Sequence, residues 1–407
     1  MKVLRINQSD ISGGAAIAVY RLHQGLLAQG IDSRFLVNWV KTSSVRVNTI
    51  PPKGRLDYQL LRITRPLGFN DIHVTSTFEI LKHPFYQEAD ILHFHNLHGG
   101  YFNYLALPSL TQNKPSILTL HDMWAITGHC AYSFECERWK IGCGQCPYPD
   151  TYPAIKRDST RWEWKLKRWV YNRSNLQAVV TTSRWHAKQA QESILNHVRV
   201  HRIPPGLDTQ AYQPLDPEQC RVILGIPTDK KVLMFAAAKL NDPRKGGDLL
   251  IKVLQNLPKS LKTETMILTL GTGGETVAET VGIPTLNLGF VGSDRLKSVA
   301  YSAADLFLFP TRAENLGLVA QEAMACGTPT VSFKVGGVPD LVRPGITGYL
   351  AEPEDVVDYC KGIVLLLEDQ TLRENLSRQC RQVALEEYGI EVYAQRYIEL
   401  YRHALAK

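Results

Sequence analysis

The chain has 407 residues, of which 44% are apolar and 21% charged, and its net charge is +7. This length is enough for two domains with separate cores, and the composition excludes a disordered chain. No stretch approaches the ~20 uninterrupted apolar residues of a membrane span. The modest positive charge fits phosphorylated ligands or an anionic lipid surface and does not require nucleic acid.

The start of the chain, MKVLRINQSDISGG, predicts a first strand over residues 2–7 and a loop that ends in Gly13 and Gly14. It lacks the small-residue cleavage site of a secretory signal, so we expect a cytoplasmic protein. Residues 15–28 then carry the apolar periodicity of a helix. A glycine pair between a strand and a helix allows the backbone to approach a ligand closely, although the full G-x-G-x-x-G fingerprint is absent.

Further strands are predicted over residues 33–38, 90–96 and 116–120, whereas the basic, irregular stretch 41–70 gives no clear pattern. The strand 116–120 leads directly into His121, which places a titratable side chain at the carboxyl end of a strand. Three other histidines are expected to be structural or to lie beside a second substrate, namely His93, His95 and His98.

An insert over residues 122–160 is rich in cysteine, in the pattern C-x5-C-x6-C-x2-C. Its four thiols are Cys130, Cys136, Cys143 and Cys146. Without an export signal, disulfides are disfavoured. Four thiols this close in sequence can wrap a tetrahedral Zn²⁺, although the spacing is not that of a standard zinc ribbon. A structural zinc and four unpaired thiols both stay open here, and a redox role is less favoured.

Residues 156–173, KRDSTRWEWKLKRWVYNR, combine basic side chains with three tryptophans. A helix of this kind can lie on an anionic membrane surface. It can equally be a surface helix whose tryptophans pack inward. A basic, aromatic segment is also compatible with nucleic acid, but we expect no nucleic-acid partner. The first two interpretations stay open.

The second half of the chain continues the alternation of strands and helices. A turn over residues 204–208, PPGLD, separates it from the first half. Strands are predicted over residues 178–182, 198–203, 231–238, 265–270 and 284–288. Helices are predicted over residues 353–369, 371–384 and 390–406.

Residues 310–329, PTRAENLGLVAQEAMACGTP, are the most informative stretch of the chain. Apolar strands are predicted on either side of it, over residues 305–309 and 330–333. A helix is predicted over residues 316–326, because strong helix formers dominate there and Gly327 then ends it. The loop before this helix lies at the carboxyl end of a strand, where open α/β sheets bind ligands.

Two carboxylates of this stretch, Glu314 and Glu322, can address one ligand at the start of the helix, because helical side chains lean toward the N-terminus. The first amides and the positive end of the helix dipole suit a phosphate there. Those amides belong to Asn315, Leu316 and Gly317. Carboxylates also accept hydrogen bonds from adjacent hydroxyls of a ribose or a hexose. In isolation the pair could be two solvated acids, but a phosphate with two hydroxyl-binding acids describes a nucleotide sugar.

The whole stretch, with E-x7-E followed by EAMACG-x-P, resembles the signature of the family 4 retaining glycosyltransferases. The resemblance covers nearly the whole chain and is strongest over residues 231–350. It implies an α/β protein of the GT-B fold, with two Rossmann-like domains facing across a cleft and a C-terminal helix crossing back to the first. The implied limits are residues 1–204 for the acceptor-side domain, 205–385 for the nucleotide-sugar domain and 386–407 for the returning helix.

The resemblance also implies roles for three side chains. Glu314 would hold the hydroxyls of the donor sugar, and Glu322 would hold the ribose diol. His121 stands in an LTLHD context, where the family has a histidine that reaches the 6-hydroxyl of the donor sugar. We therefore take His121 and Glu314 as the catalytic residues.

The diphosphate of the donor is expected to meet a second group of residues. By resemblance, Gly13 and Gly14 would face it, and so would the amides at the start of the predicted helix. Lys239 and Lys245 occupy two basic positions of the family and would neutralise the diphosphate as it leaves. The first of these positions is usually Arg, so Lys239 keeps the charge but loses bidentate geometry. Arg244 could share the task.

The implied reaction is transfer of a hexose-type sugar from a nucleoside diphosphate sugar to an acceptor hydroxyl, with retention of anomeric configuration. We find no confident nucleophile and no D-x-D metal motif, so we expect no catalytic cofactor. The implied setting is exopolysaccharide or other surface-glycan synthesis, with a saccharide or lipid-linked acceptor and peripheral contact with the inner face of the membrane. The alternatives are a nucleotide-sugar-binding protein without transferase activity and an epimerase of the same fold.

Overall fold

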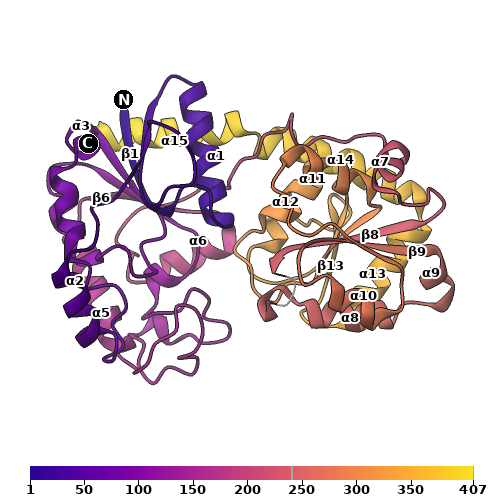
Figure 1. Cartoon of the computed structure of the whole chain (residues 1–407), viewed down its shortest axis with the longest axis horizontal. Helices are drawn as coiled ribbons and strands as arrows, with labels where there is room; N and C mark the ends of the chain where they lie inside the picture. Colours follow the sequence, from indigo (N-terminus) through magenta and orange to yellow (C-terminus); the bar gives the residue numbers. More distant parts are fainter. Residues whose placement is uncertain (240–241, 407) are drawn as a thin grey trace. The chain divides into compact units, whose positions relative to one another are not determined.

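The computed structural model describes residues 1–239 and 242–406, and the chain divides into two compact units (Figure 1). The first unit comprises Met1–Gly206 together with the C-terminal stretch from Tyr393, and the second comprises Leu207–Val392. Each unit is built on one parallel sheet. The inner strands of each sheet are almost entirely buried, as expected of parallel strands with helices on their faces, whereas the strands at the sheet edges are partly exposed.

The first unit contains a seven-stranded sheet in the order β3-β2-β1-β4-β5-β6-β7. The order changes direction between β1 and β4, and sheets of this kind bind ligands at the carboxyl ends of the strands beside such a change, here called the ligand-binding edge. The strands are β1 (Lys2–Ser9), β2 (Asp32–Trp39), β3 (Val47–Thr49), β4 (Ile91–Phe94), β5 (Ser116–Leu120), β6 (Leu176–Thr181) and β7 (Val200–Arg202).

The α-helices of the first unit cover both faces of its sheet. They are α1 (Gly14–Ala28), α2 (Arg55–Thr64), α3 (Pro84–Glu88), α4 (Leu107–Thr111), α5 (Thr160–Tyr171), α6 (Arg184–Gln191) and α15 (Ile390–Leu405). Val3 and Leu4 are neighbours in β1 and point to opposite faces. Val3 packs in a core cluster with α1 and α15, and Leu4 packs in another with α4, α5 and α6. Short 3-10 helices at Thr75–Lys82, Tyr104–Ala106, Trp124–Ile126 and Arg138–Lys140 complete the unit.

The last helix of the chain, α15, belongs to the first unit from Tyr393 onward. Figure 1 shows it in yellow, alongside the indigo β1 and α1. Tyr393, Tyr397 and Tyr401 on this helix are almost fully buried and share a core cluster with β1, β4, β5 and β6. The aromatic face of α15 therefore completes one side of the first sheet.

The second unit contains a six-stranded sheet in the order β10-β9-β8-β11-β12-β13. Here the order changes direction between β8 and β11, so the carboxyl ends of those two strands are the expected ligand-binding edge of this sheet. The strands are β8 (Lys231–Lys239), β9 (Thr265–Thr272), β10 (Thr285–Asn287), β11 (Leu306–Phe309), β12 (Thr330–Phe333) and β13 (Gly348–Ala351).

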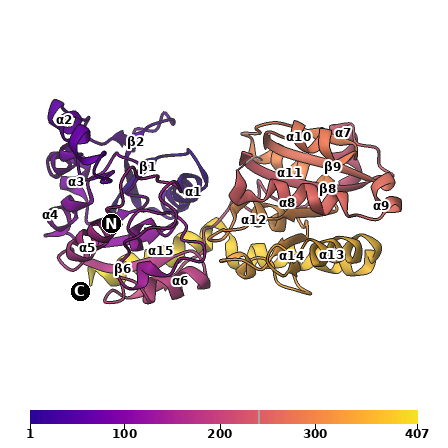
Figure 2. The same cartoon turned by 90° about the horizontal axis from the view of Figure 1, so that it is seen from below.

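The α-helices of the second unit are α7 (Pro217–Leu224), α8 (Gly247–Gln255), α9 (Lys259–Glu264), α10 (Glu275–Val281), α11 (Asp294–Ala303), α12 (Leu318–Ala325), α13 (Val356–Glu368) and α14 (Gln370–Tyr388). Short 3-10 helices lie at Pro243–Lys245 and Val338–Asp340. Helices α8, α10 and α13 pack in one core cluster, and α11, α12 and α14 pack in another. Figure 2 shows α14 beside α12 and α13.

The strand and helix predictions agree with this architecture, with two differences. The stretch 41–70, which gave no clear pattern, contains the short strand β3 and the helix α2. The helix predicted over residues 316–326 begins only at Leu318, because Gly317 before it adopts φ 97°, a left-handed conformation that cannot continue an α-helix.

Candidate functional site

Glu314 lies in the loop between β11 and α12, at the ligand-binding edge of the second sheet. The residue is 9% exposed, and its Oε2 accepts hydrogen bonds from Lys245 Nζ and, at 3.4 Å, from Arg244 Nη1. Burial raises the pKa of this carboxyl, but the two cations more than offset that, so its pKa lies below the ordinary value. Glu314 is therefore ionised at neutral pH and held by cations from the loop that follows β8.

The β8–α8 and β11–α12 loops are held together by main-chain contacts. The Arg244 carbonyl accepts hydrogen bonds from Arg312 N at 2.9 Å and from Thr311 Oγ1 at 3.0 Å. A Cβ at Gly246 would lie 1.9 Å from the Pro310 carbonyl oxygen, so only glycine allows this approach. The cations and the carboxylate of the site are therefore positioned by the backbone as well as by their own attraction.

The loop that follows β12 also contacts Glu314. The main-chain carbonyl of Glu314 accepts a hydrogen bond from Gly337 N at 3.0 Å. Gly336 adopts φ 50°, and a Cβ there would lie 2.2 Å from the same carbonyl oxygen. The sequence analysis did not connect Gly336 and Gly337 with Glu314. Two adjacent glycines do indicate a place where another stretch of backbone can approach closely.

The amides at the start of α12 differ from the prediction in one respect. Asn315 N donates to Glu314 Oε1 at 3.2 Å, so this amide is used by the adjacent carboxylate and is not open to a phosphate. For the amides of Leu316 and Gly317, the described part of the chain records no acceptor. A Cβ at Gly317 would lie 2.7 Å from the Phe309 ring, which explains the glycine at this position. The predicted phosphate-binding amides therefore reduce from three to two.

Glu322 lies on α12 and is 5% exposed. Its Oε2 accepts a hydrogen bond from Tyr301 OH, on α11, at 3.3 Å. Leu316 is also buried and belongs to the core below the helix. Glu322 is thus a supported acid on the same strand–helix unit as Glu314, and its predicted contact with a ribose stays a prediction.

The two predicted lysines are in different situations. Lys245 is paired with Glu314, as described above. Lys239 is the last residue of β8 and is exposed, and across residues 1–239 and 242–406 its side chain has no recorded ion pair. This edge of the second sheet therefore carries one paired and one exposed lysine.

In the first unit, the loop after β1 carries the predicted glycine pair at its end. Gly13 adopts φ 87° as the residue before α1, and a Cβ there would meet nothing within 4 Å. Gly14 is the first residue of the helix, whose first turn contains no acidic side chain. The start of α1 is therefore open, with a helix dipole that favours an anion.

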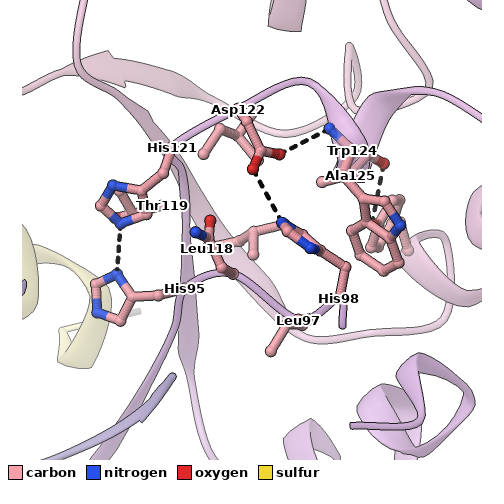
Figure 3. A pocket seen from close by; sticks show the side chains of 12 residues that line it. His95, Leu97, His98, Leu118, Thr119, His121, Asp122, Trp124 and Ala125 are labelled. Carbon is pink, nitrogen blue, oxygen red and sulfur yellow. Dashed lines mark hydrogen bonds and ion pairs between the residues drawn. The ribbon is translucent and has the colours of Figure 1, made fainter. Parts of the chain in front are cut away.

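His121 follows β5 at the ligand-binding edge of the first sheet. Its Nε2 lies 3.1 Å from Nδ1 of His95, which follows β4 (Figure 3). Burial lowers the pKa of His121 to about 4, and the Asp122 carboxylate offsets this only in part. His121 is therefore a neutral imidazole at physiological pH, able to exchange hydrogen bonds but not to act as a cation.

A second histidine, His98, lies across a small cavity from the His95–His121 contact. Its Nε2 lies 2.9 Å from Asp122 Oδ2, and Asp122 Oδ1 accepts a hydrogen bond from Trp124 N at 2.9 Å (Figure 3). Burial lowers the pKa of His98, but Asp122 more than compensates, so its pKa lies above the ordinary value. Sequence reasoning left His98 among the structural or acceptor-side histidines and did not identify its pairing with Asp122.

The four thiols of the cysteine-rich insert line one small cavity together with His129. They are Cys130, Cys136, Cys143 and Cys146, and all eight cysteines of the chain are free. Burial raises the pKa of Cys130 to about 11, so it is a protonated, weakly nucleophilic thiol. In the described ranges, no three or more His, Cys, Asp or Glu side chains are placed to hold a metal ion. The structural zinc therefore stays a prediction without support from this geometry.

Helix α5 separates the basic, tryptophan-bearing segment into a buried face and an exposed face. Lys167 is fully buried, and its Nζ donates to the carbonyls of Trp124 at 2.8 Å and Thr127 at 3.0 Å. Glu163 on the same face accepts a hydrogen bond from Tyr104 OH at 2.5 Å. Between residues 161 and 173, the exposed basic and tryptophan side chains are Arg161, Trp162, Lys165, Arg168, Trp169 and Arg173. Every helix within the described ranges is too short or too polar to span a bilayer.

The predicted site residues thus fall into separate groups. Glu314, Lys245, Asn315, Leu316 and Gly317 come together on adjoining loops of the second unit, with Glu322 on the following helix. Lys239 stands at the end of β8, beside residues outside the described ranges. Gly13, Gly14 and His121 belong to the first unit, at the ends of different strands.

Comparison with known proteins gives a match for each half of the chain. Residues 12–211 match the family described as Glycosyltransferase Family 4, and residues 216–383 match Glycosyl transferases group 1. The putative colanic acid biosynthesis glycosyl transferase WcaC of Escherichia coli K12 is 28% identical over 354 residues, which cover 82% of this chain and 83% of WcaC.

A second relative is D-inositol 3-phosphate glycosyltransferase 1 of Catenulispora acidiphila, 34% identical over 221 residues, or 51% of this chain and 52% of the relative. The chain thus matches only about half the length of this enzyme. Among solved structures, Alr3699/HepE of Anabaena in complex with UDP superposes with a TM-score of 0.70 at 17% identity, covering 99% of this chain and 100% of that one. The superposition and the two parallel sheets confirm the predicted α/β, GT-B fold. The two family matches follow one another along the chain and together cover most of it. The chain belongs to the family 4 glycosyltransferases.

Proposed function

We propose that the protein transfers a sugar from a nucleoside diphosphate sugar to an acceptor hydroxyl, with retention of the anomeric configuration of the donor. The observation that carries this proposal is the Lys245–Glu314 pair at the ligand-binding edge of the second sheet. In this pair, the lysine can bind a phosphate, and the adjacent carboxylate can accept hydrogen bonds from hydroxyl groups. A nucleoside diphosphate sugar carries the matching groups, phosphate and sugar hydroxyls, next to each other.

Each predicted site residue of the second unit discussed below then has a role in donor binding. Lys245 and Lys239 neutralise the diphosphate, on which negative charge develops as the glycosidic bond breaks. The amides of Leu316 and Gly317 add hydrogen bonds to the phosphate. Glu314 accepts hydrogen bonds from the sugar hydroxyls. The UDP complex of the similarly folded HepE makes uridine nucleotides the first donors to test.

We also propose that the reaction retains the anomeric configuration and needs no catalytic metal. A double displacement needs a carboxylate that attacks the anomeric carbon, and the Glu314 carboxylate is already engaged by two cations. We therefore assign acceptor attack and diphosphate departure to the same face of the sugar, with a phosphate oxygen taking the acceptor proton. The product's anomeric NMR signal tests retention. Unchanged transfer in the presence of EDTA tests metal independence.

Glu322→Gln is expected to raise the Kd for the nucleoside diphosphate about 10- to 100-fold. The variant keeps the shape of the side chain but removes the charge that would hold the ribose diol, and a hydrogen bond to a charged group contributes about 1.5–3 kcal/mol. Isothermal titration with the free diphosphate measures the change. Glu386→Gln on α14, an exposed acid, is the matched control and should bind like the wild type. Equal affinities in all three proteins would remove Glu322 from the nucleotide site.

We place the reaction in surface-glycan synthesis, with a saccharide or lipid-linked acceptor, because the chain resembles WcaC over most of both lengths. The alternatives are a nucleotide-sugar-binding protein without transferase activity and an epimerase. Incubation of a bound donor with a panel of saccharides separates the three. A new glycosidic product supports transfer, an altered sugar without transfer supports epimerisation, and neither product supports a binding protein.

The exposed face of α5 is the proposed contact with an anionic membrane surface. Trp162 is 62% exposed and Trp169 is 47% exposed, and basic side chains lie on the same face of the helix. Lys165 Nζ lies 5.1 Å from the Trp162 ring centre, and the Arg173 guanidinium lies 4.5 Å from that of Trp169. Tryptophans flanked by cations suit the headgroup region of anionic lipid.

The double variant Trp162→Ser/Trp169→Ser is expected to reduce binding to vesicles containing one-third phosphatidylglycerol at least about fivefold, because each basic residue near the surface contributes only about 1 kcal/mol without an apolar anchor. Co-sedimentation measures the bound fraction, with pure phosphatidylcholine vesicles as the uncharged reference. Ile223→Ser, which alters an exposed apolar residue on α7, is the control. Wild-type binding by the tryptophan variant would assign the membrane contact elsewhere or exclude it.

A further inference from the structure

The imidazole of His121 is one member of a buried row of three histidines. His95 is 2% exposed and lies 3.1 Å from His121, measured from Nδ1 to Nε2 (Figure 3). His95 in turn packs against His93 in a tilted arrangement, with ring centroids 4.0 Å apart and an interplanar angle of 43°. The orientation of His121 therefore depends on His95, and that of His95 on His93.

His93 is fixed at both of its ring nitrogens. Its Nδ1 lies 2.7 Å from Tyr401 OH, and its Nε2 lies 2.7 Å from Thr119 Oγ1. The Thr119 hydroxyl lies 2.9 Å from Tyr397 OH. Tyr397 and Tyr401 both belong to α15, so the last helix of the chain holds the ring against which His95 packs.

The surroundings of His95 determine which of its nitrogens carries the proton. Burial keeps the pKa of His95 well below its usual range, so the ring is neutral and has one N–H. Across the described residues, its Nε2 has no hydrogen-bond partner. A buried N–H without an acceptor is rarer than a buried acceptor without a donor. The proton therefore lies on Nδ1 and is donated to Nε2 of His121.

We propose that His95 is a positioning residue that holds His121 as the tautomer with its proton on Nδ1, and that α15 sets this contact through His93. With its Nε2 accepting from His95, the neutral ring of His121 carries its own proton on Nδ1. A sugar hydroxyl that meets this nitrogen is bound through its oxygen and keeps its own proton. The role toward the sugar rests on the proposed function, whereas the tautomer is a property of the protein without substrate.

The resting, full-length protein tests the tautomer by NMR after labelling with ¹⁵N-histidine. The signals of His121 are those that disappear in His121→Gln, and their nitrogen shifts report which nitrogen is protonated. We expect a proton on Nδ1 in the wild type and a shift toward the other tautomer in His95→Phe, which keeps an aromatic ring but removes the donor. A proton on Nε2 in the wild type, or an unchanged His121 in His95→Phe, would overturn the inference.

A conservative variant separates positioning from packing. His95→Asn places an amide nitrogen near the position of Nδ1 and is expected to keep both the tautomer and most of the activity. His95→Phe is expected to lower kcat about 10- to 100-fold with the donor KM changed less than about threefold. Equal losses in the two variants would show that the ring only fills space and would overturn the proposal.

Two further outcomes keep the test decisive. If His95→Phe does not fold, Tyr401→Phe removes the hydroxyl from α15 to His93, and a changed His121 signal is expected. An unchanged signal would overturn the role of α15. If the wild type transfers no sugar from any donor, the proposed function fails, while the NMR spectrum still decides the tautomer.

Discussion

Replacing Glu314 by glutamine is expected to lower kcat/KM for sugar transfer about 10²- to 10³-fold while changing the Kd of the nucleoside diphosphate less than about threefold. The carboxylate is held by Lys245 and Arg244, and we propose that it accepts hydrogen bonds from the donor sugar. Such charge-assisted bonds contribute about 1.5–3 kcal/mol each, and about 1.4 kcal/mol is tenfold in rate. Initial rates and calorimetric titration on one preparation measure both quantities.

The matched control for this variant is Glu354→Gln. Glu354 is an exposed acid that contacts Arg312 at 3.0 Å, so its replacement removes the same charge outside the proposed sugar contact. We expect wild-type turnover from it. Wild-type turnover in Glu314→Gln would exclude Glu314 from the reaction, and a large loss of diphosphate affinity would assign it to the nucleotide instead.

Lys167→Met is expected to lower the free energy of unfolding of the first unit by about 3 to 5 kcal/mol, because removing one member of a buried charge network leaves its partners uncompensated. The carbonyls of Trp124 and Thr127 lose their donor, and Glu163 loses the adjacent cation. At roughly 2–4 °C per kcal/mol, the Tm should fall by about 10 °C. Differential scanning calorimetry measures it. Lys165→Met, on the exposed face of the same helix, should unfold like the wild type.

The loss of unfolding free energy in Lys167→Met is expected to grow with pH. Burial raises the pKa of Glu163 from 4.5 to about 7 even though Lys167 opposes the shift. A carboxyl whose pKa is raised by folding contributes its full stabilisation below its pKa in the unfolded state. This stabilisation is lost as the pH rises through its pKa in the folded state. Without Lys167, the pKa of Glu163 in the folded state is higher. The free energy of unfolding therefore falls further between pH 6 and pH 8 in the variant than in the wild type. Adding Glu163→Gln should abolish this extra loss, and an equal deficit at both pH values would contradict the account.

Much of the Glu314 site could be predicted because its determinants are local. The strands β11 and β12 are short apolar stretches bounded by Pro or Gly, and α12 consists of strong helix formers, so the strand–loop–helix order follows from composition. The position of Glu314 at a ligand-binding edge then follows from parallel topology. Spacing alone did not show that the amide of Asn315 donates to Glu314, or that Gly336 contacts its carbonyl, because both depend on loop conformation.

The first unit was less predictable, because its informative contacts join residues distant in sequence. Lys167 and Glu163 belong to a stretch that reads as a charged surface helix, yet both are buried against chain segments some 40 to 60 residues away. The contact of His95 with His121 requires β4 and β5 to be neighbours, which is a property of strand order and not of either segment. The four cysteines come together around one cavity, but side-chain placement decides whether they form a ligand set.

The central claim, a donor site for a nucleoside diphosphate sugar in the second unit, is tested most directly by thermal unfolding with uridine, guanosine, adenosine and thymidine diphosphates and their sugars. We predict that one base class raises the Tm by about 5 to 10 °C at a hundred times its Kd. The rise should shrink in Glu322→Gln at the same concentration. No rise with any of these compounds, or an equal rise in Glu322→Gln, would contradict the site as assigned.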